Sequence, residues 1–194
     1  TIVDLNRAGT PLMEIVTKPV FNSPQEVRSF LRWLRLTVRR LGISDADMEK
    51  GQMRCDANVS VSKTETLGTL VEVKNLNSFA FVESALRYEI VRQTKLIESG
   101  ETVVKETRGF DERRNITISQ RKKESALDYR YFPEPDIPAF DPHEFVLKSK
   151  TTLPLPVEEF TSLVKDFPNC SPNELELLVA RSTSTENDWV AVFR

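Results

Sequence analysis

The chain has 194 residues, which is enough for one domain and part of a second. Its 27 basic and 29 acidic residues give a net charge of -2, so the overall charge predicts no nucleic-acid partner, and any RNA contact must come from a local patch. No apolar run approaches the roughly 18 residues that span a bilayer. Cys55 and Cys170 lie far apart in the sequence and form no zinc motif, which favours a reduced, intracellular protein.

The first 20 residues predict two short extended segments, Ile2–Leu5 and Leu12–Thr17, joined by a turn at Arg7–Pro11, and we expect both segments to be strands. Glu14 lies among the apolar residues of the second segment. A carboxylate at such a position either faces solvent or is buried with a partner, because charged side chains are almost never fully buried alone. The sequence leaves these two alternatives open.

A helix is predicted to begin at Pro24, because Ser23-Pro24-Gln25-Glu26 has the form of a capping box with proline at the first helical position. Apolar residues then recur at helical spacing, and Gly42 provides a left-handed end. The arginines that follow another side of this helix are Arg28, Arg32, Arg35 and Arg39. Amphipathic helices usually carry charge on the outside, so a solvated face is the favoured interpretation and an RNA-backbone contact is the alternative.

Two neighbouring stretches, Met53–Ser62 and Leu70–Asn77, alternate between polar and apolar residues as half-buried strands do. Lys63–Gly68 between them predicts an antiparallel hairpin. The polar side chains placed on one face are Arg54, Asp56, Asn58, Ser60 and Ser62 in the first stretch, and Glu72 and Lys74 in the second.

The residue types on this polar face suggest chemistry, because Asp and Asn are among the poorest strand formers. Carboxylates suit Mg²⁺, whereas arginine and lysine suit phosphate or carboxylate groups. The alternative is an ordinary lattice of cross-strand ion pairs, each contributing roughly 0.2–1 kcal/mol. The residues alone leave both interpretations open and slightly favour the lattice.

Further along, a second helix is predicted from Ser78 to about Ser99, followed by strands over Thr102–Phe110 and Ile116–Gln120 that flank a turn. The segment Asp128–Asp136 is expected to be extended, because its two prolines exclude a regular helix. Segments of this kind often carry function.

Eight of the eleven prolines lie at or after Pro133, which indicates a change of architecture. We therefore place a boundary near residue 145, within Pro142–Thr152. Residues 1–145 would form a mixed α+β part. Residues 146–194 would start an all-α domain with helices over 156–165, over 171–181 and from 185 onward.

Other catalytic motifs are missing from the sequence. His143, the single histidine, has no serine or cysteine motif around it, so a catalytic role is disfavoured. The six glycines form no phosphate-binding loop. If the protein handles ATP, we expect side chains and a metal ion to bind it.

Several segments resemble, in order, the B subunit of the tRNA-dependent amidotransferases that make Gln-tRNA(Gln) and Asn-tRNA(Asn). These segments are Asp4–Val16, Met48–Glu49 with Arg54–Ser60, Glu72–Ser78, Glu106–Arg108 with Phe110–Asp111, and Asp128–Asp136. Several long motifs in the correct order are far more specific than one short pattern.

The resemblance implies an α+β cradle with a largely antiparallel sheet and packed helices, followed by the start of an all-α domain. In this family, the B subunit uses ATP and Mg²⁺ to phosphorylate the side-chain carboxylate of glutamate or aspartate misacylated on tRNA. Ammonia, released from glutamine by the amidase (A) subunit, then displaces the phosphate, and the pair is braced by a small (C) subunit. The implied partners are therefore these two subunits and the misacylated tRNA, without a membrane.

The resemblance also implies roles for residues at the matching positions. The implied metal ligands are Glu14 and Asp56. The implied catalytic residues are Arg54, Asp56, Glu72 and Lys74. Of these, Arg54 and Lys74 would contact phosphate or the substrate carboxylate, and Asp56 and Glu72 would bind the metal ion or support its ligands. The implied substrate-binding residues are Asn58, Asn75, Arg130 and Glu134.

The chain departs from the family in lacking an N-terminal portion with a histidine and a strand glutamate, and a later His-x-Glu-Glu-Asp segment. It also begins inside Ile2–Leu5 and ends in the apolar Trp189–Arg194. We therefore expect a piece of a longer protein that is inactive alone, cytoplasmic if bacterial and mitochondrial or plastid if eukaryotic. The alternative from another functional class is a non-catalytic tRNA-binding or scaffolding module that braces an amidase partner.

Overall fold

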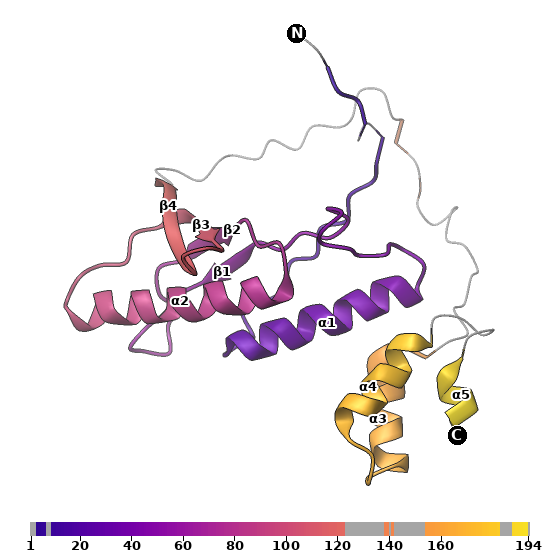
Figure 1. The fold of residues 1–194 in the computed structure, drawn as a ribbon. Helices are drawn as coiled ribbons and strands as arrows, with labels where there is room; N and C mark the ends of the chain where they lie inside the picture. The colour runs from indigo at the N-terminus through magenta and orange to yellow at the C-terminus, as the bar shows by residue number, and fades with distance from the viewer. Residues whose placement is uncertain are drawn as a thin grey trace.

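A computed structural model describes residues 3–6, 9–122, 138–139, 141, 154–182 and 188–193. Its elements, in chain order, are α1 (Pro24–Arg40), β1 (Ala57–Val59), β2 (Val71–Lys74), α2 (Phe79–Glu98), β3 (Glu106–Asp111), β4 (Ile116–Lys122), α3 (Pro156–Asp166), α4 (Pro172–Arg181) and α5 (Trp189–Phe193). Figure 1 shows α2 running along the strands, α1 beside it, and the C-terminal helices as a second group. The predicted α+β class with C-terminal helices is confirmed.

The strands form one sheet in the order β1-β2-β3-β4. β1 pairs with β2 and β3 pairs with β4 in antiparallel fashion, whereas β2 and β3 are parallel. The parallel pair is connected through α2, since parallel strands need a long crossover. The prediction of a largely antiparallel sheet is therefore confirmed.

The antiparallel hairpin forms as predicted, but its first strand is shorter than Met53–Ser62. The side-chain amide of Gln93 in α2 hydrogen-bonds to the backbone of Val59 and Val61, as a neighbouring strand would. Its oxygen accepts the Val61 N–H at 3.0 Å, and its nitrogen donates to the Val59 carbonyl at 3.4 Å. Gly68 lets the chain pass close to the backbone of Val61 on its way to β2, because a Cβ at this position would collide with the Val61 carbonyl.

The two N-terminal segments that were predicted as strands form no strand in residues 3–6 and 9–22 of the described chain. Leu12 is 93% exposed and Val16 is 81% exposed. In Figure 1 this indigo segment lies apart from the sheet. A strand needs a neighbour that satisfies its backbone groups, and this segment has none among the described residues, so the prediction is wrong here.

The helix ends follow the predicted signals. The Ser23 hydroxyl accepts the Glu26 N–H at 3.3 Å, and the Ser78 hydroxyl accepts the Phe81 N–H at 3.1 Å. Gly42 has a φ of +66°, the left-handed conformation that ends α1. Of the helices that the structure describes, none combines the length and the apolar character that a membrane span requires.

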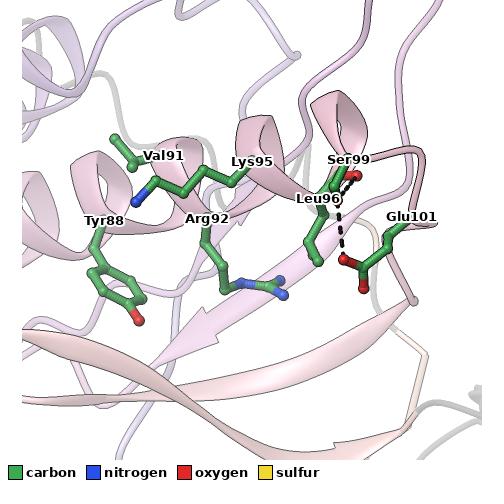
Figure 2. Close-up of a pocket in the computed structure, with 7 residues that line it drawn as sticks. All are labelled: Tyr88, Val91, Arg92, Lys95, Leu96, Ser99 and Glu101. Atoms are coloured by element: carbon green, nitrogen blue, oxygen red, sulfur yellow. Dashed lines mark hydrogen bonds between the residues drawn. The ribbon is translucent and has the colours of Figure 1, made fainter.

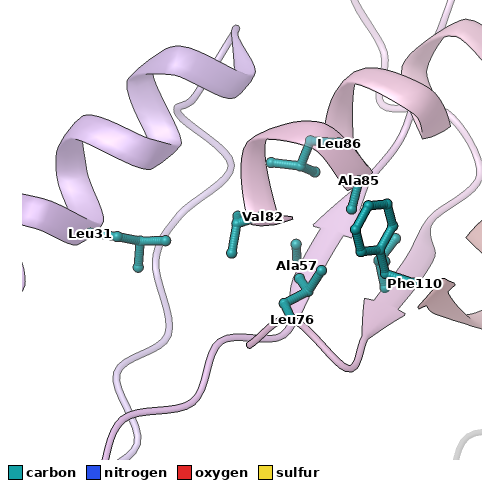
Figure 3. Packing of buried hydrophobic residues seen from close by; sticks show 8 residues of the cluster. Leu31, Ala57, Leu76, Val82, Ala85, Leu86 and Phe110 are labelled. Atoms are coloured by element: carbon teal, nitrogen blue, oxygen red, sulfur yellow. The ribbon is translucent and has the colours of Figure 1, made fainter. Parts of the chain in front are cut away.

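The main hydrophobic core lies between α1, α2 and the sheet, as Figure 3 shows. Its buried residues are Leu31, Ala57, Val73, Leu76, Val82, Ala85, Leu86 and Phe110. A second core joins α3, α4 and α5, and Trp33 of α1 packs against it. The centroids of the Trp33 and Phe160 rings lie 5.0 Å apart. The C-terminal helices are thus attached to α1, and the domain boundary near residue 145 stays a prediction.

Two arginines of α1 are exposed and also pair with neighbouring helices. Arg28 pairs with Glu83 of α2 at 2.9 Å, and Arg32 pairs with Glu176 of α4. Their side chains are still 48% and 51% exposed, so the favoured interpretation of a solvated face is compatible with the structure. An RNA contact by this stripe stays a prediction.

Arg40, the last residue of α1, anchors the C-terminal helices. Its side chain is only 4% exposed and pairs with Glu159 of α3 at 2.6 Å. The same guanidinium donates to the carbonyls of Pro154, Val179 and Ser182 at 2.7–3.0 Å. Arginine suits this position because its planar group presents five donors in a fixed arrangement.

Candidate active site on the open face of the sheet

The sheet has one face covered by helices and one face that is open. On β2, Val71 and Val73 are buried against the helices, whereas Glu72 and Lys74 point to the other side. We call that side the open face, and its members are Asp56, Asn58, Glu72, Lys74, Thr107, Gly109 and Gln120. No helix of the described part packs on it (Figure 1).

Lys74 is the centre of the open face. Its Nζ lies 3.1 Å from a carboxylate oxygen of Asp56 and 3.4 Å from one of Glu72. The hydrogen bond with Asp56 contributes most to raising the pKa of Lys74 above its usual value, and the negative charge of Glu72 adds to it against the effect of burial. Because the lysine side chain is still 37% exposed, a ligand can reach this shared cation.

Glu72 is held at both of its carboxylate oxygens. Oε1 faces Lys74, and Oε2 accepts a hydrogen bond of 2.9 Å from the Thr107 hydroxyl. Thr107 lies directly beside Glu72 in the parallel register of β2 and β3. Thr107 belongs to the matching segment Glu106–Arg108, but no role in the site was predicted for it.

Two side-chain amides converge above β3. Asn75, at the end of β2, has a φ of +61°, and Gln120 approaches from β4. A Cβ on Gly109 would lie 3.1 Å from the amide nitrogen of Asn75 and would collide with the amide of Gln120. Glycine therefore leaves the space that both amides use. Asn75 was predicted as a site residue and Gln120 was not.

Other predicted site residues are not brought to Lys74. Arg54 is exposed and makes no hydrogen bond or ion pair with the described residues. Asn58 lies opposite Glu72 and is exposed on the same face. Glu14 is exposed in the N-terminal segment.

The remaining predictions for the site concern the pocket residues and the metal. Arg130 and Glu134 lie outside the described residues. Within the described ranges, no group of three or more His, Cys, Asp or Glu side chains is arranged to hold a metal ion. The predicted metal ligands Glu14 and Asp56 therefore stay a prediction.

Cys55 lies next to Asp56 but packs towards the core. Burial, and then the charge of Asp56, raise the pKa of its thiol to about 11. The thiol is therefore protonated at neutral pH and does not act as a nucleophile.

A second charged cluster lies beneath the sheet, on the covered face. Glu89 of α2 is fully buried and pairs with Arg92 at 2.5 Å and with Arg108 of β3 at 3.4 Å. Arg108 also pairs with Glu106 at 2.6 Å, and the Thr117 hydroxyl donates to Glu89 at 2.8 Å. We call these residues, together with Gln93 and Ser119, the buried network. No residue of this network was predicted as part of a cluster from the sequence.

Glu106 shows how completely the buried network is satisfied. Burial alone would raise its pKa, but hydrogen bonds from Ser119 and Arg108 and the charge of Arg92 outweigh burial and hold the pKa below its usual value. The carboxylate is therefore ionised and occupied by neighbours within the protein. Such a cluster stabilises the packing of α2 on the sheet and leaves little capacity for a ligand.

A cavity of about 390 Å³ opens along the C-terminal half of α2. Figure 2 shows its lining residues, which are Tyr88, Val91, Arg92, Lys95, Leu96, Ser99 and Glu101. The polar groups in its wall are largely paired: Arg92 belongs to the buried network, and the Ser99 hydroxyl donates to Glu101 at 3.0 Å. None of the predicted site residues in the described part of the chain lines this cavity, so the open face is the better candidate.

Fold and site together define a class: an α+β domain whose sheet is covered by helices on one side and presents a lysine between carboxylates on the other. The chain belongs to the GatB/GatE catalytic domain family, whose model matches residues 1–148.

Similar curated proteins are named as the B subunit of aspartyl/glutamyl-tRNA(Asn/Gln) amidotransferase. The protein from Thermotoga maritima is 52% identical over 171 residues, which is 86% of this chain and 36% of the relative. The protein from Persephonella marina is 48% identical over 182 residues, or 92% of this chain and 38% of the relative. The relative from Roseiflexus castenholzii is 54% identical over 140 residues, covering 71% of this chain and 29% of its own length. The chain thus spans about a third of the length of the relatives that it matches.

Proposed function

We propose that this chain carries part of the kinase and amidation site of a tRNA-dependent amidotransferase. The substrate would be the side-chain carboxylate of Glu-tRNA(Gln) or Asp-tRNA(Asn), and ATP would activate it. The amidase (A) and small (C) subunits would be the protein partners. The relatives named above are bacterial, so we infer a cytoplasmic setting. Family membership and the name of the similar proteins support this proposal.

The single observation that carries the proposal is the position of Lys74 between Asp56 and Glu72 on an open sheet face. Phosphoryl transfer depends mainly on positioning and on neutralising negative charge. A solvent-accessible ammonium held by flanking carboxylates provides a fixed positive charge for a phosphate or a carboxylate. An ion-pair lattice without function would not need a shared cation at the centre of the only uncovered surface of the described sheet.

In the proposed reaction, an oxygen of the substrate carboxylate attacks the γ-phosphorus of ATP, and ADP leaves. Ammonia then attacks the acyl carbon, and inorganic phosphate leaves with the electron pair of the acyl–oxygen bond to give the amide. Lys74 would stabilise the charge on the transferred group, with Arg54 as a second cation. Asn58 and Asn75 would orient the substrate, and Arg130 and Glu134 would shape the pocket.

The carboxylates of Glu14 and Asp56 suit Mg²⁺ in their donor chemistry. Mg²⁺ usually takes one or two protein carboxylates and completes its shell with water and substrate phosphates. Asp56 is 51% exposed and is therefore accessible to such an ion. When bound, Mg²⁺ would supply charge neutralisation at the phosphates, and Glu14 and Asp56 would be the residues that hold it.

The proposal is tested by Lys74→Met in the assembled amidotransferase that contains this chain. We expect ATP cleavage that depends on misacylated tRNA to fall by about 10²- to 10³-fold, as for the loss of other preorganised charge-stabilising groups. Glutaminase activity of the partner should be retained, because it does not use this site. The measurement is ADP release with and without misacylated tRNA.

Lys95→Met is the matched control, since Lys95 is an exposed lysine that lines the cavity along α2. It should cleave ATP at the normal rate. Normal ATP cleavage by Lys74→Met would contradict the proposal and favour the non-catalytic tRNA-binding or scaffolding module. Loss of ATP cleavage in Lys95→Met alone would instead indicate that ATP is cleaved at the cavity along α2.

A further inference from the structure

We propose that Thr107 is a positioning residue that sets the orientation of the Glu72 carboxylate in this site. The inference rests on the proposed function, because it assumes that Glu72 acts in the reaction. It goes beyond that function by assigning a role to a neutral side chain that the sequence reasoning did not identify as part of the site.

The geometry around Glu72 carries the inference. The Thr107 hydroxyl donates to Oε2 at 2.9 Å, while the Lys74 ammonium lies 3.4 Å from Oε1. Partners on both oxygens fix the plane of the carboxylate, because they restrict rotation about its terminal torsion more than partners on one oxygen would. The Glu72 side chain is 16% exposed, so part of it remains accessible to a substrate.

Thr107 itself is well placed to hold this orientation. It is only 2% exposed and lies directly beside Glu72 in the parallel pairing of β2 and β3. Threonine is β-branched and has restricted rotamers in a strand, so its hydroxyl has a defined direction. A serine would keep the donor with more freedom, and a valine would keep the shape without the donor.

The residues on either side of Thr107 hold β3 from below. Glu106 and Arg108 point to the covered face, where they pair with each other at 2.6 Å and contact Arg92 and Glu89. A register shift occurs between Thr107 and Arg108 in the pairing of β3 with β4. The Glu106–Arg108 pair thus helps to fix β3, so that Thr107 between them has a defined position on the open face.

If Thr107 is replaced by valine, Oε2 of Glu72 loses the hydrogen bond that ties it to β3. The carboxylate can then turn towards the ammonium, which also contacts Asp56 at 3.1 Å. The Glu72 carboxylate would then be aligned for the reaction for less of the time. We therefore expect kcat to fall more than the affinity for the substrate does. Partners that orient functional carboxylates typically contribute about 10- to 100-fold to activity.

The test compares Thr107→Val and Thr107→Ser in the assembled amidotransferase, with misacylated-tRNA-dependent ATP cleavage as the readout. Thr107→Val should lower kcat about 10- to 100-fold and change the KM for ATP by less than about threefold. Thr107→Ser should restore most of the rate because it restores the donor. Equal loss in both variants, or no loss in Thr107→Val, would overturn the inference.

Thr117→Val is the matched control, because Thr117 is equally buried but donates to Glu89 on the covered face. It should lower the melting temperature without lowering kcat in the folded complex. In a Glu72→Gln background, Thr107→Val should have almost no further effect on kcat, since both changes remove the same arrangement. Additive losses would contradict action through Glu72.

The two proposals fail in distinguishable ways. If the unmodified complex shows no tRNA-dependent ATP cleavage, the proposed function is wrong. If the unmodified complex is active, Lys74→Met is inactive and Thr107→Val is fully active, then the function stands and the role of Thr107 is wrong.

Discussion

The two faces of one sheet use similar residues for different purposes. On the covered face, Glu89 and Arg108 are almost fully buried, and hydrogen-bonding neighbours such as Thr117 surround them. On the open face, Lys74 is shared between two carboxylates that remain accessible to solvent in part. The charges are alike, but only those on the open face retain the capacity to bind something else.

This difference shows which charged clusters suggest function. A buried charge is costly unless it is paired, so the paired charges of the buried network indicate a structural role rather than a binding site. Exposed ion pairs contribute little to stability, typically about 0–1 kcal/mol, so stability alone does not explain the arrangement around Lys74. Substitutions on the two faces should therefore separate stability from activity.

The largest effect on stability is expected for Glu89→Gln on the covered face. The substitution removes the buried negative charge opposite Arg92 and Arg108, and breaking one side of such a pair costs about 3–5 kcal/mol. The free energy of unfolding, measured with urea, should fall by that order. Glu83→Gln in the same helix is the control, because its ion pair with Arg28 is exposed, and its unfolding midpoint should change little. Equal effects would show that burial does not distinguish the clusters.

A somewhat smaller and more local effect is expected for Arg40→Met, which extends the comparison to the C-terminal helices. It leaves the buried Glu159 without its partner and frees carbonyls at the end of α4. We expect a loss of about 3 kcal/mol. Hydrogen exchange should accelerate in α3 and α4 while α2 stays protected. Uniform acceleration of hydrogen exchange, or the same acceleration in the exposed Arg39→Met variant, would contradict the role of Arg40 in holding the C-terminal helices.

The smallest effect concerns Cys55, which lies beside Asp56 but packs towards the core. With its pKa raised from 9.0 to about 11, the thiol should be alkylated about 100-fold more slowly at pH 8 than an unperturbed thiol. Between pH 9 and about 11 the unfolded chain loses this proton and the folded chain keeps it, so stability falls as pH rises. Alkylation rates in a Cys170→Ser background measure the thiol directly. A rate typical of an exposed cysteine would show that Cys55 is not packed as described.

Much of the fold was predictable from local signals. The capping residue Ser23 and the terminal Gly42 defined α1, and alternation in Leu70–Asn77 placed Glu72 beside Lys74. These features depend on residues close together in sequence, where backbone geometry determines the outcome.

The buried network was not predictable in the same way. Glu89 and Gln93 lie on the inner side of α2, yet their polar character resembles that of a solvated helix face. Only the pairing of β3 with β4 brings Arg108 and Thr117 to Glu89. The strand predicted at Leu12–Thr17 was wrong for a related reason, because a strand depends on a neighbour that local sequence cannot supply.

The most direct test of the account compares misacylated-tRNA-dependent ATP cleavage by Lys74→Met and Glu89→Gln complexes at a temperature where both are folded. The Glu106–Arg108 pair is untouched in Glu89→Gln, so β3 should keep its position. We predict a loss of about 10²-fold or more for Lys74→Met, and a kcat within about threefold of the unmodified complex for Glu89→Gln. Comparable losses in both variants, or full activity of Lys74→Met, would contradict the assignment of chemistry to the open face.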